Sequence, residues 1–307
     1  MTEVTASVSS QPRMNRPKIE LENSATPSAG LSVPKIRPAK SYGVGSMIGA
    51  AVILLILAAI AYGAVTNTAF GWPTVAQYFF SKPILDGVVM TLILTAISML
   101  VAVVLGTVLA VMRMSSNPVL RASSGAYSWF FRGIPVLVQL IFWFNMALLF
   151  PRIAVGLPGS APWLSIKTNL IITPFIAAIL GLGLSMAAYM AEVVRGGILS
   201  VGSGQIEAGR SLGMTRGQAL RRVILPQAMR VVLPPMGNEL IGLLKWTSLA
   251  SVIAVSELME QATLIYARNF EVIPLLLVAA FWYLLITTVF SFGQRFLENH
   301  FGKSDKR

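Results

Sequence analysis

The sequence contains no cysteine and a single histidine, His300, near its C-terminal end. Without thiols it can form no disulfide framework and has no cysteine nucleophile. One isolated histidine also leaves little for a zinc site or a Ser-His-Asp triad. We therefore expect no metal site and no bound cofactor in this chain, and we predict that it is not an enzyme.

Charged residues are scarce too, making up 12% of the 307 residues, whereas 55% are hydrophobic. A soluble domain carries roughly 25% charged residues, so this composition indicates an integral membrane protein. The net charge of +12 would favour nucleic-acid binding only if the basic residues gathered in one patch. They lie instead at the ends of apolar runs, which favours contact with membrane lipid and argues against a nucleic-acid partner.

Long apolar runs predict an all-α membrane protein with six transmembrane helices, because roughly 20 apolar residues cross a bilayer. Residues 1–43 are rich in Ser, Pro and Thr and are expected to be a disordered cytoplasmic tail. Residues 44–66 form the first predicted helix, and residues 298–307 form a second cytoplasmic tail. The other five predicted spans are Ile84 to Met112, Tyr127 to Phe150, Leu170 to Val194, Val231 to Val255 and Ile273 to Phe296.

The distribution of Lys and Arg between the loops sets the predicted orientation. With the N-terminal tail inside, the outer segments hold only Lys82, Arg152, Lys167 and Arg268, and the inner segments hold many more basic residues. This asymmetry follows the positive-inside rule and places both termini in the cytoplasm. The outer segment 151–169, which contains Trp163 and several prolines, is expected to lie at the membrane interface.

The longest polar interruption of the apolar pattern runs over residues 203–248, and its first half predicts two short helices joined by a corner. Gln205 to Leu212 forms the first helix, and Gly213 stands where a helix C-terminus favours a left-handed residue. Thr215 and Gln218 match a capping box for the second helix, which Pro226 is expected to end or kink. Such a bent basic segment fits docking onto a partner or, alternatively, an amphipathic loop on lipid headgroups.

Charged side chains within the predicted spans are costly in lipid and therefore indicate function or pairing. Glu192 and Arg195 are three residues apart and can pair on one helix. Glu239 and Lys245 are six apart, so they do not meet on a straight helix, and each needs water, another helix or a substrate. Residues 234–237, Pro-Pro-Met-Gly, could break this helix so that backbone groups face a cavity.

These residues define a candidate substrate path, whose members are Glu192, Glu239, Lys245, Thr247 and Ser248. A zwitterionic substrate needs partners of both signs, which this set provides. The same charges could instead serve as ion or proton relays in a secondary transporter or channel that works without an ATPase. Residues 302–304, Gly-Lys-Ser, do not form an ATP site, because the earlier glycine of a P-loop is replaced by Leu297.

The polar segment resembles the EAA loop of bacterial ABC importer permeases. The residues that carry the resemblance are Glu207, Ala208 and Gly209, then Gly213, then nine residues, then Val223-Ile224-Leu225-Pro226. The family pattern is Glu-Ala-Ala, three residues, Gly, nine residues and Ile-x-Leu-Pro. Gly209 and Val223 depart from it, and both are small or similar in shape to the expected residue. The resemblance implies that residues 203–226 are a coupling helix, with the Arg cluster that includes Arg216 facing a cytosolic ATPase.

Four further segments are similar to polar amino acid importer permeases of the histidine, glutamine and arginine type. They are residues 132–139, 188–197, 237–240 and 244–249. Trp246 departs from the family, in which an acidic residue is common beside the lysine. The resemblance covers residues 84–297 and implies a five-helix core in the bacterial inner membrane. It also implies a second permease subunit, the same or a relative, a periplasmic amino acid-binding protein, and ATP and Mg on a partner ATPase.

Overall fold

The computed structural model describes residues 44–155, 157 and 162–301, so the predicted tail 1–43 and residues 302–307 lie outside the described residues. The helices in chain order, with their bounds, are α1 Val44–Thr66, η1 Thr68–Phe70, α2 Trp72–Phe79, α3 Lys82–Arg113, α4 Pro118–Gly133, α5 Val136–Phe144, α6 Met146–Leu149, α7 Thr168–Ile171, α8 Pro174–Leu199, α9 Ser203–Ser211, α10 Arg216–Ala219, η2 Leu220–Ile224, α11 Leu225–Trp246, η3 Thr247–Ile253, α12 Leu258–Asn269 and α13 Val272–Phe301. Two strands, β1 Arg152–Val155 and β2 Leu164–Lys167, complete the described elements.

The all-α membrane fold predicted from the sequence is confirmed. Four helices, α1, α3, α8 and α13, are each long and apolar enough to cross a bilayer. Two bent pairs of helices also pass the same test when each pair is taken as one span, which gives up to 6 crossings. This agrees with the predicted number. By their contacts the residues divide into a unit that ends at Ala58 and a second unit that begins at Ala59, and the account below concerns the second.

The predicted span Tyr127–Phe150, which Arg132, Gly133 and Pro135 interrupt near its start in the sequence, is a bent pair of helices. Helix α4 begins earlier than predicted, at Pro118, and meets α5 at an angle of 98°. The break lies at Ile134, whose extended backbone (φ −101°, ψ 130°) precedes Pro135. A residue before proline is pushed out of the α region, so the local sequence Gly-Ile-Pro explains the bend.

The helix does not end at Pro226, and the possible break at Pro234-Pro235 does not occur. A helical path runs from Gly217 to Ile253. Before Pro226 the chain widens into the π-turn η2, in which the Leu225 N–H bonds to the Leu220 carbonyl five residues back. Such a wide turn is a known form of helix irregularity, and it carries the helix past a proline near the start of α11. Pro234 and Pro235 then lie inside α11 without interrupting it.

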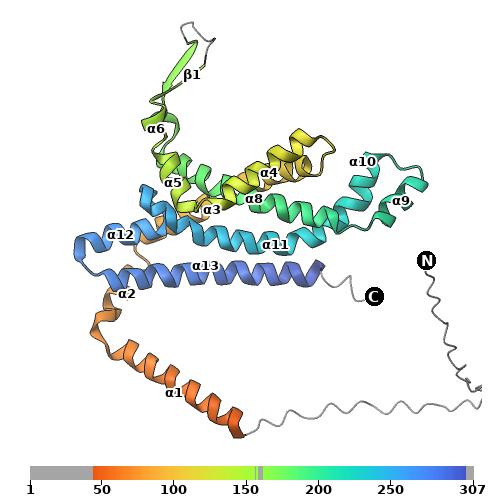
Figure 1. The fold of residues 1–307 in the computed structure, drawn as a ribbon. Coiled ribbons are helices and arrows are strands. Elements are labelled where there is room, and N and C mark those ends of the chain that lie inside the picture. The colour runs from red at the N-terminus through yellow and green to blue at the C-terminus, as the bar shows by residue number, and fades with distance from the viewer. Residues whose placement is uncertain (1–43, 156, 158–161, 302–307) are drawn as a thin grey trace, which may run out of the picture. The chain divides into compact units, whose positions relative to one another are not determined.

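The core forms where α3, α8 and α11 pack side by side, as the parallel course of α8 and α11 in Figure 1 illustrates. Small residues permit this close packing, which in lipid depends on van der Waals contact. A Cβ on Gly106 of α3 would lie 2.5 Å from the Met190 Cβ of α8. A Cβ on Gly197 of α8 would lie 2.2 Å from the Val232 Cγ2 of α11.

A second cluster joins α2, α3, α12 and α13 and includes Ile84, Leu258, Leu275 and Val278. Glu257 caps α12 within this cluster: its carboxylate accepts from the backbone N–H groups of Met259 and Glu260. The Tyr283 hydroxyl of α13 donates to the same carboxylate over 2.6 Å. Helix α13 continues to Phe301, so its last turn occupies residues that the sequence assigned to the C-terminal tail.

The outer segment 151–169 contains a short antiparallel hairpin that the sequence did not predict. β1 pairs with β2, with Arg152 opposite Lys167 and Val155 opposite Leu164. Its stem joins α6 and α7, and the strands stand away from the helices in Figure 1.

Candidate functional site

The predicted two-helix segment is present and lies at one end of the bundle, beyond the C-terminus of α8 (Figure 1). The first helix, α9, covers Ser203–Ser211, close to the predicted Gln205–Leu212. Gly213 has a φ of +74°, which confirms the predicted left-handed residue. Two hydrogen bonds close the helix end: Gly213 N–H donates to the Arg210 carbonyl (2.9 Å) and Met214 N–H to the Gly209 carbonyl (3.1 Å). This pair is the Schellman motif.

The predicted capping box also forms. The Gln218 N–H donates to the Thr215 Oγ1 over 3.3 Å, and the Thr215 N–H donates to the Gln218 Oε1 over 2.9 Å. Four backbone donors on the two sides of the corner are therefore satisfied within the segment itself, by Schellman bonds or by the capping box. An exposed turn that satisfies its own hydrogen bonds can keep its shape without support from a partner.

The EAA residues take different positions in this segment. Glu207 and Ala208 are exposed, whereas Gly209 is buried and lies toward the second helix, where its Cβ would meet the Met214 Sδ at 3.5 Å. An alanine here, as in the family pattern, would therefore make ordinary van der Waals contact with the turn. Leu212 at the corner is 79% exposed, which presents an apolar side chain at the outermost point of the segment.

The basic part of the segment lies on α10 and η2. Arg221 and Arg222 line an open pocket together with Thr215, Gly217 and Gln218. Leu225 is 48% exposed, and Pro226 follows it in the first turn of α11. The Arg216 side chain is outside what the structure describes, so its predicted orientation stays a prediction.

A second group of candidate residues lies where α4, α8 and α11 meet. The Arg132 guanidinium lies over the Tyr189 ring, 5.2 Å from its centroid. Tyr189 in turn makes an edge contact with Trp246, with ring centroids 5.8 Å apart. Arg132 also acts electrostatically on Glu239, which is half-buried on α11. The structure thus places a cation over one of two contacting aromatic rings, with Glu239 within electrostatic range of that cation.

The other residues of the predicted substrate path differ in their exposure and in their partners. Glu192 pairs with Arg195 (2.7 Å), as predicted. Lys245 is exposed, and the Ser248 hydroxyl donates to its carbonyl. Thr247 is fully buried and its hydroxyl donates to the Leu244 carbonyl, so in this conformation it has a structural position and does not line an exposed path.

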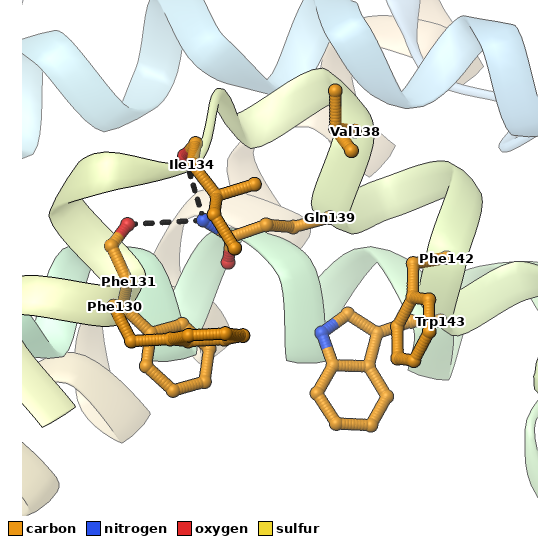
Figure 2. A pocket seen from close by; sticks show the side chains of 7 residues that line it. All are labelled: Phe130, Phe131, Ile134, Val138, Gln139, Phe142 and Trp143. Carbon is orange, nitrogen blue, oxygen red and sulfur yellow. Dashed lines mark hydrogen bonds between the residues drawn. The ribbon is translucent and has the colours of Figure 1, made fainter.

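The sequence interpretation did not identify Gln139, which fixes the bend that carries Arg132. Figure 2 shows its amide reaching the carbonyls of Phe131 (3.0 Å) and Ile134 (2.9 Å). Its carbonyl oxygen accepts from the Ser185 hydroxyl of α8 over 2.7 Å. One side chain therefore satisfies two carbonyls at the bend and fastens the bend to α8. Its only signal in the sequence is an amide within an apolar run, four residues after Pro135.

An apolar pocket of about 220 Å³ opens beside this bend (Figure 2). Its lining residues are Phe130, Phe131, Ile134, Val138, Gln139, Phe142 and Trp143. Gln139 is the only polar side chain among them, and its amide is directed at the backbone carbonyls. The pocket therefore offers little to a charged ligand, and the polar group around Arg132 and Glu239 is the better candidate for substrate contact.

The bundle, its broken spans and the self-capped two-helix segment define a membrane permease subunit. A family model described as "binding-protein-dependent transport system inner membrane component" matches residues 102–303, and the chain belongs to this family. It is a multi-pass inner-membrane permease subunit of an ABC importer.

Individual relatives make the family relationship more specific. The chain is 45% identical to the arginine transport system permease protein ArgU of Corynebacterium glutamicum, over 92% of this chain and 88% of that protein. It is 33% identical to the glutamine transport system permease protein GlnP of Escherichia coli, over 74% of this chain and 94% of that protein.

Solved structures agree with the fold. A crystal structure of an amino acid ABC transporter with histidines is similar with a TM-score of 0.61 and 33% identity, covering 73% of this chain and 97% of that one. The MetNI methionine ABC transporter in an inward-facing form shares the fold with a TM-score of 0.57 at 21% identity, covering 72% of this chain and 99% of that one.

Proposed function

We propose that this permease subunit imports a polar amino acid, with arginine as the first candidate, and that residues 203–226 couple it to a separate ATPase subunit. The observation that carries the proposal is the group of Arg132, Tyr189, Trp246 and Glu239 on three helices. A relative that is 45% identical and is named an arginine permease supports the choice of substrate.

The polar group has the chemistry that an amino acid requires. A substrate carboxylate would interact with Arg132, and an ammonium or guanidinium group with Glu239. The aromatic faces of Tyr189 and Trp246 would favour a cation beside them. Lys245 is exposed on α11 and adds a second positive group for the carboxylate. In this proposal Glu192 balances Arg195, and Ser248 contributes at most a neighbouring hydroxyl.

The two-helix segment is the proposed contact with the ATPase. It is exposed, satisfies its own backbone hydrogen bonds and combines apolar Leu212 with the basic pair Arg221 and Arg222. Glu207, Ala208, Gly209 and Gly213 shape it, and the arginines would face acidic residues of the partner. In this proposal ATP and Mg bind to the partner ATPase, and this chain contributes no catalytic residue.

The remaining parts of the assembly follow from the family. A second permease subunit, identical or related, would close the polar group from the opposite side, and a periplasmic binding protein would deliver the substrate. Both termini would then lie in the cytoplasm, on the side of the two-helix segment. Helix α1 precedes the family match, and the proposed five-helix core begins near residue 84.

Uptake by the purified complex in proteoliposomes tests this function. With ATP inside and the cognate binding protein outside, we expect uptake of labelled arginine, which Glu239→Gln reduces at least tenfold while the ATPase stays bound. The matched control is Glu271→Gln, which changes an exposed carboxylate outside this group.

Two outcomes would overturn the proposal. One is uptake driven by an ion gradient in the absence of ATP, which would indicate a secondary transporter. The other is equal uptake by Glu239→Gln and the wild type, which would exclude the polar group from the substrate path.

A further inference from the structure

The hairpin formed by β1 and β2 carries apolar side chains on one face and basic or small side chains on the other. In a strand successive side chains point to opposite faces, and paired residues share a face. Arg152 and Lys167 are paired and lie on the same face as the Ala154–Ser165 pair. The Ile153–Ile166 and Val155–Leu164 pairs fill the other face. The hairpin is therefore amphipathic, with one wholly apolar face and one basic face.

The apolar face has no cover within the described part of the chain. Ile153 is 38% exposed, while Val155 and Leu164 are each 55% exposed. Trp163, next to the start of β2, is 73% exposed. A two-stranded hairpin is only marginally stable when it stands alone in water. This hairpin therefore needs a further apolar surface.

The basic face also needs a partner. Like charges directly opposite one another on a hairpin are destabilising. Among the residues that the structure describes, Arg152 and Lys167 form no ion pair with a carboxylate. The Arg152 guanidinium is held in place by Ser165, with Nε donating to the Ser165 Oγ (2.8 Å) and Nη2 to its carbonyl (3.2 Å). An anion between the two cations would relieve their repulsion, and phosphate oxygens suit such a pair.

The stem fixes the hairpin at one level of the bundle. Thr168 is fully buried; its N–H donates to the Pro151 carbonyl (3.1 Å) and its hydroxyl to the Phe150 carbonyl. The hairpin precedes α8, whereas the two-helix segment follows it, and 26 residues of helix span about 39 Å. The hairpin and the two-helix segment thus lie toward opposite membrane surfaces.

Apolar residues on either side of the stem continue the exposed surface. Leu148 of α6 is 81% exposed, Phe150 is 59% exposed and Leu170 of α7 is 72% exposed. In a membrane protein such a surface normally faces lipid. The apolar face of the hairpin and the residues beside its stem are thus both exposed, which favours lipid over a soluble protein as the occupant of that face.

We propose that the hairpin is a membrane-surface anchor that binds the phosphates of lipid headgroups. Its apolar face and Trp163 lie at the boundary of headgroups and acyl chains, as in other amphipathic interfacial segments. Arg152 and Lys167 face the headgroups and give a preference for anionic lipid. This anchor holds the outer end of the α6–α7 connection at a fixed depth. The proposal of an anchor rests on the chain being a membrane protein and is independent of which substrate it imports.

A chain without cysteine permits a direct test, because a single introduced cysteine can be labelled selectively. Leu164→Cys and Ser165→Cys are neighbours on opposite faces of β2 and form a matched pair. Each full-length variant, assembled with its partners, is labelled with an environment-sensitive fluorophore and reconstituted in vesicles that contain brominated phospholipid. We expect several-fold stronger quenching at position 164 than at position 165.

Equal quenching at both positions, or none at either, would overturn the anchor. So would protection of position 164 that appears only when the binding protein is added, because that result assigns the apolar face to a protein partner. These readouts do not require transport, so they distinguish a failure of the anchor from a failure of the proposed import function.

The headgroup preference has a separate test. In the Leu164→Cys protein, which is also the background for the variants below, quenching of the probe by brominated phospholipid is expected to increase when phosphatidylglycerol is added to phosphatidylcholine vesicles. The double variant Arg152→Gln/Lys167→Gln should lose this increase, whereas Arg268→Gln, which changes an exposed arginine on α12, should keep it. The same response in all three proteins would refute phosphate binding by the basic face.

Discussion

Gly213→Ala is the most direct test of the two-helix segment, because the substitution changes only the energy of the backbone conformation at the turn. Gly213 has a φ of +74°, and a Cβ placed on it would meet nothing within 4 Å. The substitution therefore creates no steric clash with the rest of the chain. What remains is the cost of a left-handed backbone for an L residue, about 1–2 kcal/mol.

That cost falls on the Schellman turn and so on the relative orientation of α9 and α10. A change of about 1–2 kcal/mol alters a two-state ratio roughly 5–30-fold. If the ATPase binds only the formed corner, its affinity for the permease should fall by up to this factor. Gly213→Asn should be milder, because asparagine tolerates the left-handed region better than alanine does.

The assay measures binding of the purified ATPase subunit to the permease in nanodiscs, together with ATP hydrolysis stimulated by the binding protein. The control is Gly204→Ala, which lies in α9 of the same segment and also adds a methyl group to open space. Its affinity should stay within about twofold of wild type, as is typical of surface substitutions. Unchanged binding by Gly213→Ala, or an equal loss in Gly204→Ala, would refute the argument that the turn geometry is recognised.

Three further predictions concern the bundle, and thermal unfolding in detergent measures each. Gly106→Ala should destabilise the protein by about 1–3 kcal/mol, because its Cβ would clash with α8, whereas Gly196→Ala on α8 meets open space and should be tolerated. Gln139→Leu should cost about 1–3 kcal/mol, because it removes the donors to two carbonyls at the bend; Ser185→Ala, which removes one bond, should cost less. Glu257→Ala should cost about 1–3 kcal/mol, because it uncaps α12 inside the core, and Glu257→Gln should recover part of the loss. A variant among Gly106→Ala, Gln139→Leu and Glu257→Ala that melts at the wild-type temperature would contradict the prediction made for it.

The features predicted correctly from the sequence are local ones, namely turns, helix caps and ion pairs formed by residues close together in the chain. The left-handed Gly213 and the Thr215–Gln218 capping box were both inferred from spacing, and both form. The Glu192–Arg195 pair was likewise inferred from their separation on a helix. In each case the interacting groups lie within five residues of one another, so the sequence contains the whole interaction.

The bend between α4 and α5 shows where such inference fails. The run from Tyr127 to Phe150 is interrupted near its start by Arg132, Gly133 and Pro135, and Pro135 accounts for the break at Ile134. The sequence does not reveal the contact that holds the two helices at their angle, because Gln139 bonds to Ser185, which is 46 residues away. A contact of that range leaves no periodic pattern, so the angle between α4 and α5 could not be predicted. The hairpin is similar, since each of its strands has only four residues and gives little periodic signal.

The continuity of the helix at Pro226 is the most informative outcome, because a broken helix and a continuous one would transmit motion differently. Had α11 begun anew at the proline, a movement of the two-helix segment could be absorbed at the break. The π-turn instead joins Arg221 and Arg222 to α11 in one helical path that continues to Ile253.

That path places the proposed ATPase contact and Glu239 on the same continuous element, some 18 residues or about 27 Å apart from Arg221 to Glu239. Gly197 packs against Val232 between them, and any larger residue there would collide, so α8 and α11 are closely packed at this level. A displacement of the two-helix segment therefore cannot be absorbed at a break within α11. It should tilt α11 together with α8, which carries Tyr189. Because α4 is fastened to α8 through the Gln139 bend, the three helices that carry the proposed substrate group would tilt as one body, and the group would move relative to the proposed second permease subunit.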